Sequence, residues 1–170
     1  MRTMVDIYEE GLEEFPRAGI LLGNLLIVIW IALGTVACYF FNHIIAWVYL
    51  GAALLMVFVV LRRLVCVNCY YYGRWCPTGW GRLSALLFKQ GDIEKFGGSP
   101  GLKLAPVTYG LLTLVPLVLG TISAVRDFAA IKPVVLAAIL VIGFYSGSIG
   151  RKKACARCRM KLCCPGCAAR

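Results

Sequence analysis

Cysteine is the residue type in this chain whose spacing is best suited to chemistry. The sequence holds nine cysteines, and eight of them fall in two short clusters. Three pairs, in the motifs CVNC, CARC and CPGC, place two thiols three positions apart, which lets one backbone turn offer both sulfurs to one metal. The sequence therefore predicts cysteine-ligated metal sites. Their candidate ligands are Cys66, Cys69, Cys76, Cys155, Cys158, Cys163, Cys164 and Cys167.

The number of clustered thiols matches two metal sites with four ligands each. One interpretation gives the C-terminal site four ligands and leaves the fifth cysteine of that cluster, Cys163, to join the first cluster, although other partitions are open. In that interpretation the C-terminal ligands are Cys155, Cys158, Cys164 and Cys167, and the other site takes Cys66, Cys69, Cys76 and Cys163. A ligand that crosses between clusters would tie two distant segments together.

The identity of the metal is less constrained than the identity of the ligands. Cys76 and Cys164 are each followed by proline, as is the last cysteine of the bacterial ferredoxin run, although neither cluster has the full spacing of that run. The two C-terminal pairs are separated by five residues, where zinc ribbons commonly have about 15 to 20. We expect an iron–sulfur cluster, with zinc as the alternative.

Basic side chains surround both clusters. Cations favour the thiolate form of cysteine and offset the negative charge of a metal centre with four thiolate ligands. Each of them also has a simpler role as a signal of membrane topology. These residues are Arg62, Arg63, Arg74, Arg151, Lys152, Lys153, Arg157, Arg159 and Lys161.

Long uncharged runs predict how these clusters are positioned. The 170 residues are 61% hydrophobic, and residues 18–61, 104–125 and 133–150 contain no Asp, Glu, Lys or Arg. A membrane span needs about 20 apolar residues, so the first run holds two helices, which we expect to break between Phe40 and His43. The predicted fold is an all-α integral membrane protein with four transmembrane helices, in hairpins over 18–64 and 104–150.

The distribution of Lys and Arg predicts the orientation of these hairpins. Of the 18 cations, two precede the first span, seven lie in residues 62–103, seven follow residue 150, and two lie in residues 126–132. Cytoplasmic segments of membrane proteins carry the excess of Lys and Arg. We therefore expect a multi-pass protein of the cell membrane, with both termini and both cysteine clusters in the cytoplasm.

Three segments outside the hairpins complete the plan. Residues 1–17 have apolar side chains at roughly helical spacing (Val5, Tyr8, Leu12 and Phe15) with acids between them, which predicts a surface helix. Residues 65–103 form a cysteine-containing middle loop, in which residues 78–90 predict a short amphipathic interfacial helix. Residues 151–170 form a cysteine-rich tail.

Several functional classes are excluded by what the sequence lacks. The spans contain no ionisable residue of the kind that proton- or ion-coupled carriers use, and the single histidine, His43, cannot supply both axial ligands of a membrane b-type haem. No P-loop, GxSxG or HExxH motif occurs, so no catalytic residue is assigned. Topology and anionic lipid explain the net charge of +10, and no nucleic-acid partner is expected.

Three functions fit the remaining evidence. The first is an iron–sulfur subunit that passes electrons to or from a larger membrane complex or a quinone, because clustered thiols in the reducing cytoplasm are more often metal ligands than disulfides. The second is a non-catalytic subunit with structural zinc sites. The third is thiol–disulfide or soft-metal handling, with Cys163 and Cys164 as the reactive pair. The plan loosely resembles disulfide-generating quinone reductases, in which the cysteines face the oxidising side instead.

Overall fold

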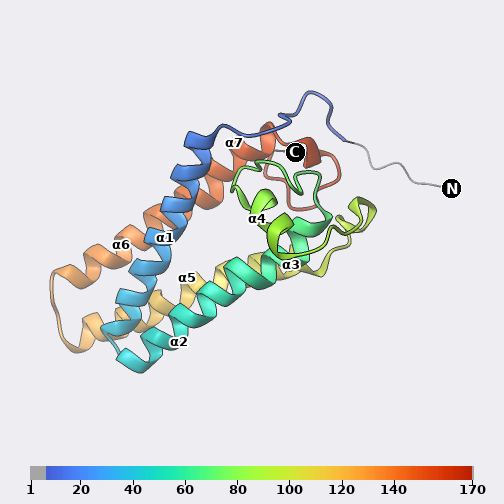
Figure 1. Ribbon diagram of the computed structural model, residues 1–170. Helices are drawn as coiled ribbons and strands as arrows, with labels where there is room; N and C mark the ends of the chain where they lie inside the picture. Colours follow the sequence, from blue (N-terminus) through green and yellow to red (C-terminus); the bar gives the residue numbers. More distant parts are fainter. Residues whose placement is uncertain (1–6, 170) are drawn as a thin grey trace.

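Four long helices make up most of the computed structural model, which describes residues 7–169 (Figure 1). By length and hydropathy each is able to cross a membrane, over Arg17–Tyr39, His43–Asn68, Pro100–Arg126 and Ile131–Ala156. In chain order the elements are α1 (Arg17–Tyr39), α2 (His43–Leu54), a π-helical turn (Leu55–Val60), α3 (Leu61–Val65), a 3-10 turn (Cys66–Asn68), α4 (Trp80–Leu87), a 3-10 turn (Ile93–Lys95), α5 (Pro100–Arg126), α6 (Ile131–Phe144), a π-helical turn (Tyr145–Gly150), α7 (Arg151–Ala156) and a 3-10 turn (Arg159–Lys161).

Polar side chains define the turns at the end of the bundle away from the cysteine clusters. Asn42, in the predicted break, caps α2 by accepting hydrogen bonds from the N–H groups of Ile44 at 2.8 Å and Ile45 at 3.4 Å. At the other turn, α6 begins at Ile131 and includes Lys132. The Lys132 ammonium is 7% exposed and donates to the carbonyls of Ser123 and Asp127, so it neutralises the C-terminal end of α5.

The core of the bundle is apolar and close-packed. The Tyr49 hydroxyl donates to the Leu112 carbonyl at 2.8 Å and joins α2 to α5. Gly34 of α1 leaves room for that ring, since a Cβ there would lie 2.3 Å from the Tyr49 oxygen, an instance of the small residues that let membrane helices approach. Cys38 is fully buried in the same core, where it acts as a small apolar group.

The outer surface of the long helices is also apolar. Leu21, Val48, Val107 and Val141 are all more than half exposed, although each lies on one of the four candidate spans. A water-soluble protein rarely exposes such a continuous apolar surface, whereas a bilayer covers it without cost. The four long helices are therefore compatible with the expected multi-pass membrane protein, while the cytoplasmic orientation stays a prediction.

The segments that carry the cysteines gather at one end of the bundle. α3, α4 and α7 lie together there, opposite the turns that join α1 to α2 and α5 to α6 (Figure 1). The two cysteine-bearing span helices extend beyond their predicted ends at residues 64 and 150, to Asn68 and Ala156. Cys66 and Cys155 consequently stand on the ends of the span helices themselves, where the bundle holds their backbones.

The surface helix expected over residues 1–17 is not formed in residues 7–16, and Val5 lies outside the described residues. Residues 7–16 instead form an extended N-terminal strap whose backbone pairs with the tail. Gly11 packs so closely on Arg159 that a Cβ there would lie 2.7 Å from the Arg159 nitrogen. The prediction from helical spacing was wrong here because backbone groups of the strap form hydrogen bonds with the tail instead of with one another in a helix.

The structure places a helix, α4, within the second segment predicted to be an amphipathic helix, residues 78–90. Gly81 and Ser84 form its buried face, while Leu83, Leu86 and Leu87 are exposed. Its leucines thus face outward from the protein, as in a helix that lies against a membrane surface. Its placement in the membrane interface stays a prediction.

Candidate metal centre

The three CxxC motifs share one backbone geometry. In each motif the N–H of the second cysteine donates to the carbonyl of the first, so that the four residues of the motif close one turn. The bonds run from Cys69 to Cys66 at 3.3 Å, from Cys158 to Cys155 at 3.2 Å and from Cys167 to Cys164 at 3.1 Å. Such a turn brings both side chains of a pair within reach of one metal ion.

Backbone N–H groups also point toward the sulfurs. Cys69, Cys158 and Cys164 each accept from the residue two positions further along, namely Tyr71, Met160 and Gly166. Cys76 lies in a different loop, and its sulfur accepts from the Gly81 N–H at 3.3 Å. A hydrogen bond to sulfur favours the thiolate, which is the form that ligates metals.

The two clusters begin with the same local structure. In each hairpin the second helix passes through a π-helical turn and then a basic pair, Arg62 and Arg63 or Arg151 and Lys152, before its first CxxC motif. After the motif, the chain continues with a further turn, in which Tyr72 donates to the Cys69 carbonyl at 3.0 Å and Lys161 to the Cys158 carbonyl at 3.1 Å. The two halves of the chain thus present their cysteines on equivalent scaffolds.

The loop and tail thiols lie near enough to affect one another's pKa values. Cys69 interacts electrostatically with Cys66 and Cys76 of the middle loop and with Cys158 of the tail. Cys158 in turn interacts with Cys155 and Cys164. The Cys155 and Cys167 thiols raise one another's tendency to stay protonated, and Cys164 interacts with Cys155, Cys167 and Cys163. All of them are free thiols.

The expected partition of the ligands between two sites stays a prediction. Cys158, which we assigned to the tail site, is the tail thiol that neighbours Cys69. Cys163, which we assigned to the loop site, donates from its sulfur to the Met160 carbonyl at 3.5 Å, and its own carbonyl lies 3.5 Å from where a Cβ would stand on Gly97 of the middle loop. Within residues 7–169 no group of three or more Cys, His, Asp or Glu side chains is placed to hold a metal ion as it stands. Metal binding therefore requires the thiols to draw closer.

The half-buried thiols of the two clusters resist ionisation. Burial raises the pKa of the Cys69 thiol, and the nearby thiols add to this against the lowering effect of the Tyr71 N–H. Burial raises the pKa of Cys158 to about 11, and it also raises the pKa of Cys164. In the metal-free protein these groups are protonated at neutral pH, so a metal must displace their protons on binding.

Two polar side chains beside Cys66 have donors without acceptors. Arg62 is only 8% exposed, and its Nε and Nη2 atoms make no hydrogen bond, while its guanidinium lies 4.8 Å from the centre of the Trp80 ring. The Ser84 hydroxyl, 1% exposed, is likewise unpaired. Both side chains are close enough to the Cys66 sulfur to interact with it. A buried cation without an acceptor is costly, which marks this as a place suited to an anionic group.

A three-way junction fixes the strap, the middle loop and the tail to one another. Tyr8 and Leu12 of the strap donate to the carbonyls of Arg159 and Arg157, both at 2.9 Å. The Arg159 side chain donates to the Gly11 carbonyl at 3.1 Å, to the Tyr70 hydroxyl at 3.0 Å and to Glu13 at 3.0 Å. These bonds hold the second cysteine pair close to the first.

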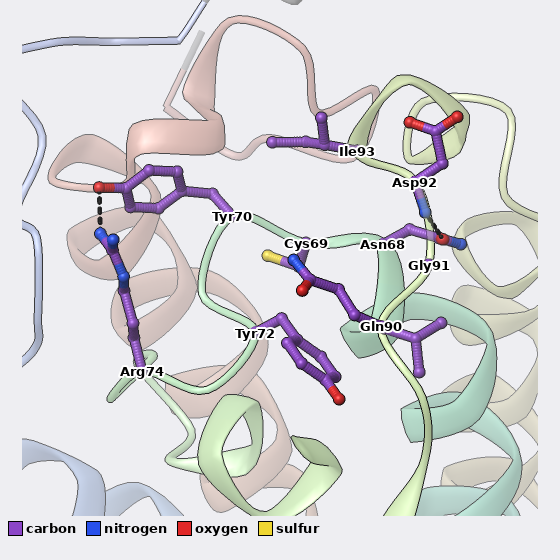
Figure 2. A pocket seen from close by; sticks show the side chains of 10 residues that line it. Asn68, Cys69, Tyr70, Tyr72, Arg74, Gln90, Gly91, Asp92 and Ile93 are labelled. Carbon is purple, nitrogen blue, oxygen red and sulfur yellow. Dashed lines mark hydrogen bonds between the residues drawn. The ribbon is translucent and has the colours of Figure 1, made fainter.

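An open hollow gives access to one of the loop thiols. It has a volume of about 500 Å³, and the sulfur of Cys69 faces into it between Tyr70 and Tyr72 (Figure 2). Arg74 stands at its edge and donates to the Tyr70 hydroxyl. On the other side, the Asn68 side chain accepts from the Asp92 N–H at 3.0 Å and pins the loop.

Sequence reasoning did not identify Asn24, Tyr71 or Ser84 as parts of this site, and it did not predict the burial of Arg62. Asn24 lies in span helix α1, yet its amide donates to the Thr78 carbonyl at 2.9 Å and accepts from the Trp80 indole at 3.1 Å. The signal that could have identified Asn24 from the sequence is its position as a polar residue within an apolar span. Tyr71, Ser84 and the buried state of Arg62 had no comparable signal, because each depends on tertiary packing. No protein-family model, curated protein or solved structure matches this chain.

Proposed function

We propose that this protein is a membrane electron-transfer subunit whose cysteine end holds iron–sulfur clusters on the cytoplasmic side. The observation that carries the proposal is the hydrogen bond from the Arg159 N–H to the Tyr71 hydroxyl at 3.1 Å, which joins the tail just after Cys158 to the loop just after Cys69. Four cysteine sulfurs are the usual ligand set of such clusters. A cluster so held would exchange single electrons between a larger membrane complex and a quinone.

This proposal includes a partition of the eight ligands. The first cluster takes Cys66, Cys69, Cys76 and Cys158. The second takes Cys155, Cys163, Cys164 and Cys167. Each cluster then has four thiolates, and Cys158 crosses from one segment to the other, as the cysteine before proline does in two-cluster ferredoxins. The junction around Arg159 would keep the crossing ligand in place.

The surroundings of the first cluster suit an anionic sulfur-rich group. The free donors of Arg62 and Ser84 face Cys66, and sulfide and thiolate sulfurs would supply the acceptors that both lack. Backbone N–H groups already point at Cys69, Cys76 and Cys158. Hydrogen bonds to the sulfurs and nearby cations are among the factors that set the reduction potential of iron–sulfur clusters.

Structural zinc is the second candidate. It is favoured by the junction itself, because closed four-cysteine zinc sites typically pin short segments of irregular chain together. Thiol–disulfide chemistry ranks third. Reactive cysteines have lowered pKa values and exposed thiolates, whereas burial raises the pKa of Cys69, Cys158 and Cys164.

Iron and sulfide analysis of cysteine variants tests the proposal and its partition together. We would first remove the second cluster with the double substitution Cys164→Ser and Cys167→Ser. In that background, adding Cys158→Ser should abolish the remaining iron and sulfide, whereas adding Cys163→Ser should leave both unchanged. Cys38→Ser is the matched control, since Cys38 lies in the bundle core. In that background, loss of the remaining iron with Cys163→Ser but not with Cys158→Ser would restore the original partition, and stoichiometric zinc without iron would favour the second candidate.

A further inference from the structure

The second half of the fourth span lies apart from the rest of the bundle. It consists of the π-helical turn Tyr145–Gly150 and α7, and none of its residues is buried, although the structure describes all of them. The most apolar stretch of this span is 11% buried, against 28% in each of the other three spans. The π-helical turn packs mainly on α6 and α7, which precede and follow it in the same helix. One side of this helix is therefore left to a neighbour from outside the chain.

Small residues gather on one face of this half-span. Positions three and four apart share a helix face, and here such positions hold Gly143, Ser146, Gly147 and Gly150, which form the small face. A Cβ added at Gly147 would meet no atom of the described chain within 4 Å. Gly120 of α5 differs, because a Cβ there would lie 2.7 Å from Leu136 of α6. Packing within the chain thus does not require glycine at position 147, although glycine destabilises a helix relative to alanine.

An unpaired polar group lies beside the start of the small face. Trp30 of α1 is 6% exposed, and its indole N–H has no hydrogen-bond partner among the described residues. A Cβ added at Gly143 would lie 3.7 Å from this nitrogen and would meet no other described atom within 4 Å. A buried donor without an acceptor is costly, above all in the apolar interior of a bilayer. A polar atom that enters the space beside Gly143 from outside the chain would supply the missing acceptor.

Opposite charges lie near the same end of the molecule. Lys152 and Lys153 of α7 follow the small face directly and are exposed, and so are Glu9 and Glu14 of the strap. In the described part of the chain none of these four side chains belongs to an ion pair. A helix that packs on the small face brings its own flanking segments to the level of the two lysines. A second copy of this chain would bring the acidic strap.

We infer that the small face is the dimer interface of this protein, where the fourth spans of two copies in the same orientation cross at Gly143 and Gly147. Small residues let two helix backbones approach closely, and a serine hydroxyl or backbone carbonyl of the approaching helix is then the acceptor for the Trp30 N–H. A two-fold axis along the membrane normal makes this contact self-complementary. An acyl chain of a lipid would cover the face, but it would supply neither this acceptor nor acids for the two lysines. The inference goes beyond the proposed function and is independent of it, because no cysteine belongs to the small face.

The oligomeric state of the full-length protein in liposomes tests this inference. We would label the protein with a fluorophore on an appended tag, dilute it over a series of protein-to-lipid ratios with reducing agent present, and count subunits by stepwise photobleaching. The reducing agent prevents disulfides between copies. The wild-type protein should pass from one subunit to two as the ratio rises, with no larger species.

Matched glycine variants locate the interface. Gly147→Leu should weaken dimerisation at least tenfold, because its side chain holds the backbones apart. Gly51→Leu is the control, since Gly51 is exposed on α2 and a Cβ there also meets nothing within 4 Å. Trp30→Phe removes the N–H and should weaken dimerisation about threefold. The iron content of Gly147→Leu should equal that of the wild type, so loss of the dimer and loss of a cluster are measured separately.

A zero-length carbodiimide crosslinker tests the contact between the strap and α7. On a mixture of light and heavy isotope-labelled protein, it should join a glutamate of one copy's strap to Lys152 or Lys153 of the other copy.

Three results would overturn the inference. The first is a wild-type protein that stays monomeric at every protein-to-lipid ratio, as expected if lipid or a different subunit covers the small face. The second is equal weakening by Gly147→Leu and Gly51→Leu. The third is crosslinking of the strap to α7 only within single copies.

Discussion

The hydroxyl of Tyr71 accepts a hydrogen bond from the backbone N–H of Arg159 at 3.1 Å, although the two residues are 88 positions apart. The same hydroxyl donates to the Leu12 carbonyl at 2.6 Å. Tyr71 is only 1% exposed, so one buried phenol joins the strap, the middle loop and the tail. Arg159 directly follows Cys158, and Tyr71 lies two residues after Cys69. The bond therefore sets how closely these two thiols approach.

Tyr71→Phe should loosen the cysteine end without unfolding the bundle. The change leaves a buried N–H and a buried carbonyl without their partner, which costs about 1 to 3 kcal/mol. We expect trypsin to cleave the tail at Arg157 faster in the variant, while the four long helices stay resistant. Tyr39→Phe is the control, because Tyr39 is 62% exposed at the other end of α1. Equal cleavage rates in the two variants would show that the phenol does not hold the junction.

Replacement of Arg62 should change the reduction potential of the first cluster. Arg62→Gln removes a buried cation beside Cys66. Loss of this positive charge destabilises the reduced cluster, which is the more negative state, so the reduction potential should fall by on the order of tens of millivolts. Arg63→Gln removes the neighbouring exposed cation and should change the potential much less. A redox titration followed by electron paramagnetic resonance measures both. Identical potentials in the two variants would place the cluster away from Arg62.

Removal of metal should release the tail from the middle loop. In the proposed partition Cys158 is a ligand of the loop cluster, so metal binding adds folding free energy to the contact between these segments. Treatment with a chelator under oxidising conditions, or the substitution Cys69→Ser, should increase hydrogen exchange in residues 157–169. The core around Tyr49 should exchange as before. Unchanged exchange in the tail of Cys69→Ser would mean that the two clusters are independent.

The orientation of the bundle is testable with reporter cysteines. Gly98→Cys lies in the middle loop, where a Cβ meets no other atom within 4 Å, and Phe128→Cys replaces a side chain that is 78% exposed in the opposite turn. A membrane-impermeant thiol reagent added to intact cells should label the Phe128→Cys protein alone. Labelling of Gly98→Cys in sealed cells would reverse the topology and promote the disulfide interpretation.

The long helices were predictable because their determinants are local. Uncharged runs long enough to cross a bilayer gave all four, and Asn42 marked the first turn. Their cysteine-side ends were not predictable, since basic and cysteine residues can continue a helix as well as end it. The strap was misjudged for a related reason. Tyr8 and Leu12 have helical spacing, yet their N–H groups pair with the tail.

The candidate site was predictable in its residue types but not in its pairing. The CxxC spacings identified the thiols, because a single turn determines each pair. Whether Cys158 or Cys163 approaches Cys69 depends on the path of the tail, which Tyr71 and Arg159 fix over long sequence separations. The unpaired donors of Arg62 and Ser84 depend on the packing of α3 against α4, which no local pattern encodes.

The central claim is most directly tested by the absorption spectrum and metal content of the protein purified without oxygen. We predict a brown protein with a broad absorbance near about 400 nm that dithionite partly bleaches, together with iron and acid-labile sulfide in equal amounts. That spectrum should be absent when Cys66, Cys69 and Cys76 are replaced by serine together with Cys164 and Cys167. A colourless protein that contains neither iron nor sulfide, after anaerobic reconstitution with both, would contradict the account.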